Sequence, residues 1–385
     1  MNNKPIAVVV GSGLNALGVV RSLAVAKMPI WLVCSEKDAA VHTRYAKKIF
    51  IEDTAGDSLI AALLGIARRF EEKPVLFLTE EKSVVTVSER REELLPFFRI
   101  TLPAQELLTA LMHKQGFQEI AFRYESPVPT AVHLRSEADL PGLAKLRYPC
   151  VLKPAFKHYG YGARFQKAYV VMSEKEAVER FQEISPILPD LIVQEWIEGD
   201  DSDIYFCLQF IGADNKNIAS FTGRKIRSWP PRIGGTASCT SAPEYEAELT
   251  AITESFFKKA GFVGMGSMEY KRDRRDGRFY MVEPTVGRTD FQEEVATING
   301  TNIPLAAYCY EVGLPLPRST VLVPQRIWRE PITDRWSAEL QPMISDVTGA
   351  RIIDAYWRAD DPQPWFALAI DRIKGRFAKL LMNRF

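Results

Sequence analysis

A predicted β-hairpin with one carboxylate on each arm constrains the fold of this chain most. Glu269 lies in the apolar run GMGSMEYK and Glu283 in YMVEPTV, and the polar segment RDRRDG between them is typical of a turn. Acidic side chains are rare in buried strands unless a cation meets them there. The two carboxylates could converge on one Mg²⁺ ion, which leaves its other positions to water and phosphates. Alternatively, they form ordinary ion pairs with Lys271, Arg272 or Arg288.

Two segments upstream have the chemistry of a phosphate site. The short apolar strand YPCVLKP places Lys153 near its end, where an ammonium group can meet a phosphate as a point charge. The next loop, KHYGYGARFQK, contains Gly160 and Gly162, and glycine lets backbone N–H groups approach anionic oxygens closely. An exposed lysine after a buried strand is the plainer interpretation of Lys153 taken alone.

The segment LIVQEWIEGDDSD predicts where the base and sugar of a nucleotide lie. An apolar strand runs here into a polar linker, and its edge can offer backbone N–H and C=O groups to an adenine. We expect Asp201 or Asp203 to accept hydrogen bonds from ribose hydroxyls. The residues expected along the base are Gln194, Glu195, Trp196 and Ile197.

A basic segment, RKIRSWPPRIGG, follows two further predicted strands. Arginines beside a glycine turn suit carboxylate or phosphate groups, although a solvated basic loop is the plainer alternative. We expect catalytic roles for Arg224 and Lys225. Contacts with the substrate are expected for Arg227, Arg232, Gly234 and Gly235.

The order of these motifs, a lysine strand, a glycine loop, a QEWIEG hinge and two carboxylates on later strands, resembles the ATP-grasp superfamily over roughly residues 105–315. Within it the chain looks closest to the carboxylate-amine ligases, the group that includes D-alanine-D-alanine ligase, D-aspartate ligase and the carbamoyl phosphate synthetase subdomains. The resemblance implies ATP and one or two Mg²⁺ ions, for which Mn²⁺ could substitute. It also implies that the basic segment covers an acyl phosphate site and that Lys114 contacts nucleotide phosphates.

The second metal motif departs from the family pattern. The family has a glutamate, an asparagine two residues later and an arginine four residues after the glutamate. Here Glu283 is followed by Thr285, and Arg288 is displaced by one position. A threonine hydroxyl is a weaker Mg²⁺ ligand than an amide oxygen, so the departure puts the second ion in doubt. Arg288 remains the candidate to stabilise charge on transferred phosphoryl oxygens.

The first hundred residues predict a parallel α/β unit of the shape that ATP-grasp proteins typically carry ahead of the nucleotide domain. Strands IAVVV, IWLVC and VLFLT alternate with helical segments. Gly11 and Gly13, with Ala16 and the later Glu36, also fit a loose dinucleotide fingerprint. A nicotinamide or flavin oxidoreductase is therefore a rival interpretation. The alternative is a glycine turn that packs a helix tightly on a strand.

Two segments after the metal hairpin are less specific. TDFQEEVATINGTNIPLAAYCY resembles the closing helices of ATP-grasp domains, so Glu293 and Glu294 are expected at the surface. At the end of the chain, Phe366, Ile370, Ile373, Phe377 and Leu380 have helical spacing among basic residues. This amphipathic helix either lies on an anionic membrane or packs its apolar stripe on the domain, and we favour packing.

Composition excludes several classes of protein. The 385 residues are 46% hydrophobic and 25% charged, which is typical of a globular chain with two or three domains. Lys and Arg number 49 against 48 Asp and Glu, so the basic excess of nucleic-acid binders is missing. Five scattered cysteines without CxxC spacing, and no long apolar run, predict a reduced, cytoplasmic protein.

The predicted fold combines α/β and α+β parts: a Rossmann-like N-terminal domain precedes a two-lobed ATP-grasp domain with antiparallel sheets. The expected boundaries are 1–104 for the first domain, 105–200 for the small lobe, 201–320 for the large lobe and 321–385 for an extension. The expected activity joins a small carboxylate to an amine, or to a thiol, through an acyl phosphate with release of ADP and phosphate. The two alternatives to this ligase are a non-catalytic ATP-binding scaffold protein and the oxidoreductase named above.

Overall fold

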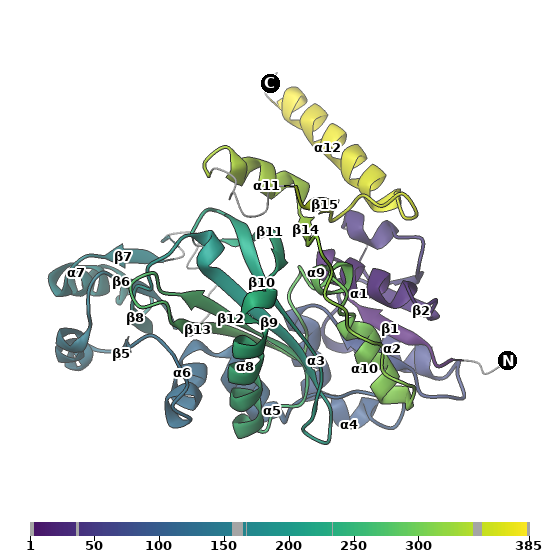
Figure 1. Cartoon of the computed structure of the whole chain (residues 1–385), viewed down its shortest axis with the longest axis horizontal. Coiled ribbons are helices and arrows are strands. Elements are labelled where there is room, and N and C mark those ends of the chain that lie inside the picture. The colour runs from purple at the N-terminus through teal and green to yellow at the C-terminus, as the bar shows by residue number, and fades with distance from the viewer. Residues whose placement is uncertain are drawn as a thin grey trace.

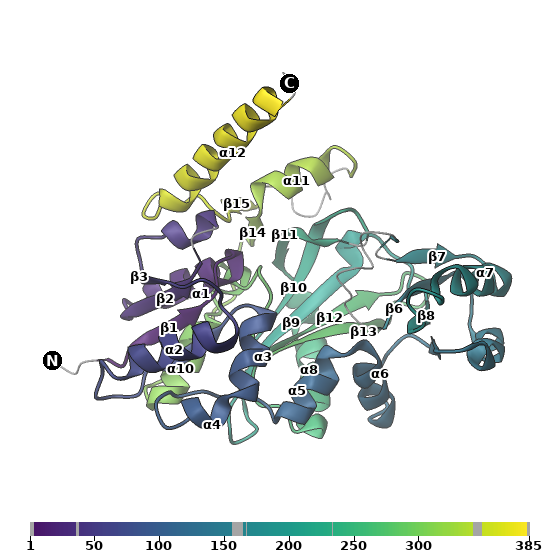
Figure 2. The same ribbon diagram turned by 180° about the vertical axis from the view of Figure 1, so that it is seen from behind.

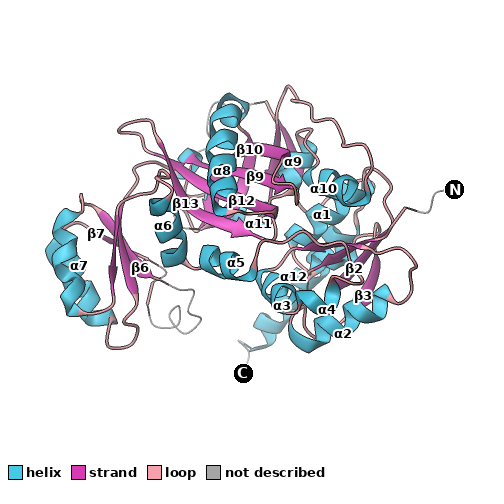
Figure 3. Ribbon diagram, turned by 90° about the horizontal axis from the view of Figure 1, so that it is seen from below, coloured by secondary structure: helices cyan, strands magenta, loops and turns pink. Residues whose placement is uncertain are grey.

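Three sheets with their covering helices make up the described part of the chain (Figure 1). The computed structural model describes residues 4–35, 38–155, 165–166, 168–232, 234–341 and 349–382, with the backbone alone for 375–382. Figure 3 shows the sheet of β6 and β7 at one end, that of β2 and β3 at the other, and the strands β9 to β13 between them. The fold is therefore mixed α/β, with one parallel and two mainly antiparallel sheets, as predicted.

The N-terminal sheet has four parallel strands in the order β3-β2-β1-β4. The predicted apolar strands are confirmed, and β1 is fully buried because it is central and has helices on its faces. The edge strand β3 comes from the polar run KKIF, which the apolar pattern did not predict as a strand. The elements are β1 (Ala7–Val10), α1 (Leu14–Ala24), β2 (Ile30–Cys34), η1 (Ala39–His42), β3 (Lys47–Phe50), α2 (Gly56–Ala67), β4 (Val75–Leu78), α3 (Glu81–Glu89) and α4 (Arg91–Leu94).

The second sheet is antiparallel, in the order β5-β8-β6-β7, and has a hydrophobic core of its own. One face packs on α7, whose Phe181 and Ile184 are buried against Leu152 and Val193. Since side chains alternate along a strand, Lys153 points to the other face. The elements, after α5 (Gln105–Met112) and α6 (Lys114–Arg123), are β5 (Ala131–Leu134), η2 (Glu137–Lys145), β6 (Cys150–Pro154), β7 (Tyr169–Val171), α7 (Glu174–Ile184) and β8 (Leu191–Glu195).

The third sheet has seven strands in the order β13-β12-β9-β10-β11-β14-β15. Its strands are antiparallel except for the last pair, β14 and β15, which come from beyond residue 320. The elements are η3 (Asp201–Asp203), β9 (Ile204–Ile211), β10 (Asn217–Trp229), β11 (Gly235–Ser241), η4 (Pro243–Tyr245), α8 (Glu246–Ala260), β12 (Gly264–Arg272), β13 (Phe279–Val286), α9 (Glu294–Ile298), α10 (Ile303–Val312), β14 (Arg326–Arg329), α11 (Pro331–Ala338), β15 (Arg351–Asp354) and α12 (Gln363–Met382).

The expectation that Glu293 and Glu294 lie at the surface is wrong. Both are buried, because α9 packs between α1 and the large sheet. A carboxylate oxygen of Glu294 lies 2.7 Å from Arg358 and another 3.9 Å from Arg21. Glu293 accepts a hydrogen bond from Ser22, and burial together with the adjacent Glu294 raises its pKa to about 8.

The favoured packing of the C-terminal apolar stripe is also wrong for its described residues. Phe366, Ile370 and Ile373 are 52%, 51% and 56% exposed. Helix α12 starts beside η1 and then runs away from the body of the molecule, as Figures 1 and 2 show from opposite sides. In the part of the chain that the structure describes, no helix has the length and apolar character needed to cross a membrane.

Candidate functional site

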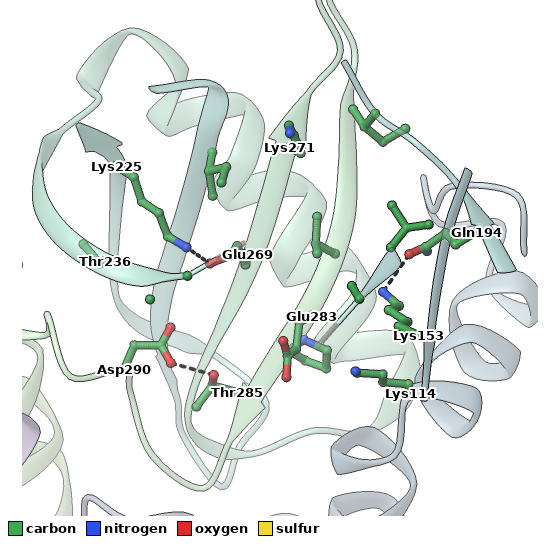
Figure 4. Close-up of a pocket in the computed structure, with 18 of the residues that line it drawn as sticks. Lys114, Lys153, Gln194, Lys225, Thr236, Glu269, Lys271, Glu283, Thr285 and Asp290 are labelled. Atoms are coloured by element: carbon green, nitrogen blue, oxygen red, sulfur yellow. Dashed lines mark hydrogen bonds and ion pairs between the residues drawn. The ribbon is translucent and has the colours of Figure 1, made fainter. Parts of the chain in front are cut away.

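A pocket of about 380 Å³ lies between the β5-β8-β6-β7 sheet and the β12–β13 hairpin of the seven-stranded sheet. This volume lies within the range of small-molecule sites. Its walls come from β6 and β8 on one side and from β12 and β13 on the other. The end of the pocket is lined by Arg232, Gly234, Gly235, Thr236, Arg288, Asp290, Phe291 and Gln292. Figure 4 shows that basic and acidic side chains from these separate elements point into the same space.

The predicted hairpin is present, and its two glutamates face each other. Glu269 on β12 is the direct cross-strand partner of Glu283 on β13, so both side chains lie on one face of the sheet. Glu283 is exposed in the pocket, while Glu269 is 26% exposed. The two carboxylates are therefore placed where one cation could meet both.

Glu269 is already paired with a buried lysine. The Nζ atom of Lys225, on β10 two strands away in the sheet, lies 2.7 Å from Oε2 of Glu269 (Figure 4). Burial lowers the pKa of Lys225, but the charge and hydrogen bond of Glu269 outweigh it, so the pKa of Lys225 is raised overall. Lys225 is thus a permanent cation in the pocket wall.

A third carboxylate supports the threonine that replaces the family asparagine. Asp290 accepts a hydrogen bond from Thr285 Oγ1 at 2.7 Å and another from Ser267 Oγ at 2.9 Å. Because the proton of the Thr285 hydroxyl is directed at Asp290, the lone pairs of Oγ1 are left for another partner. This arrangement makes the hydroxyl a better cation ligand than the residue type alone suggests.

The residues near the hairpin are suited to a hard cation. Glu269, Glu283 and the oriented Thr285 hydroxyl supply oxygen ligands of the kind that Mg²⁺ takes together with water and phosphates. Among the described residues, no three His, Cys, Asp or Glu side chains form a group that could hold an ion by themselves. An ion here would therefore share its ligands with a phosphate-bearing molecule.

Two lysines, one on α6 and one on β6, face the hairpin across the pocket. Lys153 on β6 donates a hydrogen bond of 2.8 Å to Gln194 Oε1 on β8, and Lys114 at the start of α6 lies 3.5 Å from the carbonyl oxygen of Pro154. Both lysines line the pocket and point towards Glu283 (Figure 4). Together they provide a positive wall opposite the carboxylates.

The hinge residues also lie on the pocket wall, where the strand β8 ends. Gln194, Glu195, Trp196 and Ile197 all line the pocket. The Lys271 ammonium lies 4.7 Å from the centre of the Trp196 ring, and burial lowers the pKa of this lysine. A flat apolar surface beside strand-edge peptide groups suits a planar heterocycle.

The predicted ribose acceptors are not brought to the pocket. Asp201 is 2% exposed and accepts hydrogen bonds from the backbone N–H groups of Ser228 and Arg232. Asp203 lies 2.6 Å from Nε of Arg274, on a tight turn with Asp200. Neither aspartate is among the described residues that line the pocket, because Asp201 binds the connection between β10 and β11 and Asp203 binds the turn before β9.

The basic segment is divided between the site and the core. Arg224 and Arg227 are absent from the described pocket wall. Arg224 directly precedes Lys225 on β10, and because side chains alternate along a strand, it points away from the pocket that Lys225 lines. Arg227 pairs with Asp334 of α11 at 3.0 Å. Arg232 and Arg288 do line the pocket.

Gly234 and Gly235 line the pocket too, at the start of β11. A Cβ at Gly234 would lie 1.9 Å from the backbone of Trp229, so only glycine fits that turn.

The glycine turn of the first domain binds a side chain of the protein itself. The backbone N–H of Ser12, between Gly11 and Gly13, donates to a carboxylate oxygen of Glu80 at 2.8 Å. Thr79 Oγ1 fills the space beside Gly11. Gly11 and Gly13 are not among the described residues that line the pocket. This placement favours a glycine turn that packs a helix tightly on a strand over a turn that binds a dinucleotide. Glu36 lies outside the described residues, as do Gly160 and Gly162 of the other glycine loop.

Several residues of the pocket wall escaped the sequence analysis as ligand-binding candidates, among them Lys271, Asp290 and Gln292. Lys271 was considered only as an ion-pair partner, although alternation places it on the same strand face as Glu269. Asp290 and Gln292 follow the metal motif in a segment without strand or helix periodicity, so no pattern marked them. The Oε1 atom of the buried Gln292 has no hydrogen-bond partner within the described part of the chain.

The chain is similar to known proteins in sequence and in fold. No family model matches the chain. A D-aspartate ligase of Enterococcus faecium (strain Aus0004) is 24% identical over 322 residues, which cover 78% of this chain and 75% of the ligase.

Two solved structures share the fold. N5-carboxyaminoimidazole synthetase from Staphylococcus aureus matches with a TM-score of 0.63 and 14% identity, over 85% of this chain and 83% of its own. The biotin carboxylase domain of Hydrogenobacter thermophilus 2-oxoglutarate carboxylase, solved with MgADP, ADP and bicarbonate, matches with a TM-score of 0.61 and 15% identity, over 81% and 71%. The chain is therefore similar in sequence to a D-aspartate ligase and shares the fold of these two structures, in agreement with the resemblance that the order of its motifs predicts.

Proposed function

We propose that this protein is an ATP-dependent ligase that joins a small carboxylate to an amine through an acyl phosphate and releases ADP and phosphate. The observation that carries the proposal is the placement of Glu269 and Glu283 opposite each other on the hairpin, with Lys114 and Lys153 facing them across the pocket. This pairing of a cation site with a positive wall is suited to a triphosphate. The kinship with a D-aspartate ligase favours an amino acid as the carboxylate.

The described residues would bind ATP from the hinge to the hairpin. Adenine would lie at Trp196 and Ile197, and the phosphates between Lys114, Lys153 and the carboxylates. Mg²⁺, held by Glu269, Glu283 and Thr285, would neutralise charge on the phosphate oxygens. Asp290 would keep the Thr285 hydroxyl turned towards that cation. A second ion and replacement by Mn²⁺ belong to the same proposal.

The chemistry consists of two transfers. A carboxylate oxygen of the substrate forms a bond to the γ-phosphorus, while the bond from that phosphorus to the bridging oxygen breaks and ADP leaves with the electron pair. The amine nitrogen then attacks the carbonyl carbon, phosphate leaves with the electrons of the C–O bond, and a proton passes from nitrogen to the phosphate. Arg288 and Lys225 stabilise the negative oxygens in both steps. Arg232 and Gly235 lie at the end of the pocket where the acid would bind.

The same proposal covers the organisation of the chain. The first 104 residues would form the Rossmann-like domain that precedes the ATP-grasp lobes, with boundaries near 200 and 320 as expected. The two strands β14 and β15 nevertheless pair with the large sheet, so that sheet continues to residue 354. The five cysteines are buried and free, which supports a reducing compartment such as the cytoplasm.

An ADP-release assay tests this function. The wild-type protein, with Mg²⁺ and ATP, is screened with amino acids, D-aspartate first, combined with amines and thiols. We expect one combination to release ADP, and Glu283→Gln to lower that rate at least about 100-fold, since a cation ligand acts on the transferred group. The matched control is Glu248→Gln, on the exposed side of α8.

The outcomes separate the alternatives. ADP release that is equal in wild type and Glu283→Gln would overturn the site. If Mg²⁺-ATP raises the melting temperature but every substrate combination fails, the protein is a nucleotide-binding scaffold. Stabilisation by a nicotinamide or flavin dinucleotide without an effect of ATP would support the oxidoreductase instead.

A further inference from the structure

The C-terminal helix carries an apolar stripe that the rest of the described chain does not cover. Phe366, Ile370 and Ile373 follow the i, i+4, i+7 spacing of one helix face, and each is about half exposed. In the sequence the same spacing continues with Phe377 and Leu380.

Aromatic side chains extend this surface at the start of the helix. The rings of Trp357 and Trp365 lie 5.7 Å apart, and the ring of Phe366 lies 5.3 Å from Trp365. Trp357 is 44% exposed and Trp365 39% exposed. Aromatic rings of this kind are typical of the boundary between water and lipid, because they have an apolar body and, in tryptophan, one polar N–H.

A different face of α12 is directed at the protein. Trp365, Leu368, Ala369, Arg372 and Ile373 line a groove with Pro331 and Ile332 of α11, so one edge of the stripe adjoins the side of the helix that faces the protein. Asp371, on the side opposite the stripe, is close enough to Asp38 beside η1 to raise the pKa of that carboxyl, although burial is the larger cause. The helix is thus held by its other faces while the apolar stripe points outward.

The charges around the stripe identify its partner. Arg372 and Lys374, both exposed, lie about 100° to either side of Ile373 around the helix. From residue 363 to the end, the sequence has five basic residues and one acid, whereas the whole chain has a net charge of only +1. An apolar stripe flanked by basic groups matches the acyl chains and the anionic headgroups of a bilayer. Two copies of the same stripe would instead bring like charges together.

We propose that the α12 face carrying Phe366, Ile370 and Ile373 docks on an anionic lipid bilayer and lies in its surface. The position of α12 outside the body of the molecule lets a flat surface reach this face (Figures 1 and 2). The helix lies apart from the hairpin strands β12 and β13 (Figure 1). Because the pocket lies between that hairpin and strands β6 and β8, docking would hold the enzyme at a membrane without covering its site.

Vesicle co-sedimentation of the full chain tests the proposal. Vesicles of phosphatidylcholine and phosphatidylglycerol at 3:1 are compared with vesicles of phosphatidylcholine alone, for wild type, Ile370→Ser/Ile373→Ser and Arg372→Glu/Lys374→Glu. The matched control is Val25→Ser/Phe122→Ser, because these two apolar residues are 72% and 82% exposed elsewhere on the protein. Circular dichroism and the ADP-release rate check that every variant is folded.

We expect wild type and the control to bind the anionic vesicles, and both α12 variants to lose at least about tenfold in bound fraction. Binding should fall in about 0.5 M salt, which screens the headgroup charge. Wild type that stays in the supernatant, equal binding to phosphatidylcholine alone, or unchanged binding of Ile370→Ser/Ile373→Ser would each overturn the proposal. A dimer in sedimentation velocity that Ile370→Ser/Ile373→Ser abolishes would show that a second copy covers the stripe instead.

Discussion

Removing Glu269 should destabilise the protein more than removing its partner Lys225. Lys225 is 4% exposed and its Nζ lies 2.7 Å from Glu269, which is itself 26% exposed. Glu269→Gln therefore leaves a cation buried without its counter-charge, whereas Lys225→Met removes the buried charge and leaves a carboxylate that water can reach. A metal-free buffer with a chelator is required, so that the comparison concerns this pair alone.

The size of the effect follows from the geometry. Loss of one partner from a fully buried pair costs about 3–5 kcal/mol, and the partial exposure of Glu269 places this case near 3 kcal/mol. For a folding unit of 150–250 residues, 1 kcal/mol corresponds to about 2–4 °C, so Glu269→Gln should lower the melting temperature by about 6–12 °C. We expect about 1 kcal/mol or less for Lys225→Met, since a water-accessible carboxylate needs little compensation.

A double-mutant cycle by differential scanning calorimetry measures the pair. Glu269→Gln/Lys225→Met should lose only about 1–2 kcal/mol, against about 3 kcal/mol for Glu269→Gln alone, with a coupling energy of about 2 kcal/mol, because the buried charge is gone. Equal losses in the two single variants that add in the double variant would refute the argument. Glu248→Gln on α8 is the control for replacing an exposed glutamate.

Three further predictions concern other residues. The pKa of Glu293 is raised to about 8, so the stabilisation from its protonated form is complete below the unfolded value of 4.5 and is lost as pH rises towards 8. The free energy of unfolding of the wild type should therefore fall by up to about 2.7 kcal/mol between about pH 5.5 and 7.5. Glu293→Gln should not show this fall when calorimetry is done at both pH values. Asp290→Ala should raise the Mg²⁺ concentration needed for nucleotide binding about tenfold in titration calorimetry. Thr285→Val should behave similarly, and Thr285→Ser should stay near wild type. If Asp290→Ala leaves this Mg²⁺ concentration unchanged, Asp290 does not position the Thr285 hydroxyl. Gly234→Ala should lower the melting temperature, since the methyl group meets the Trp229 backbone, whereas alanine at the uncrowded Gly65 should not.

The hairpin, the lysine strand and the parallel N-terminal sheet could be predicted from the sequence, because each depends on local periodicity. The pairing of Glu269 with Glu283 needed only two apolar strands and one turn. Alternation also places Lys153 on the face of β6 that is turned away from α7. The existence of each strand, and the face on which its side chains lie, follows from local periodicity in the sequence.

Tertiary structure alone decided which charged groups reach the pocket. Asp201 satisfies a buried turn and Arg227 pairs with Asp334, more than one hundred residues away, so neither is available to a ligand. Asp290 is held at the site because it accepts hydrogen bonds from the hydroxyls of Ser267 on β12 and Thr285 on β13. In the glycine turn, the backbone N–H of Ser12 donates to Glu80. Side-chain partners distant in sequence determine the free energy of a buried charge, and no local pattern records them.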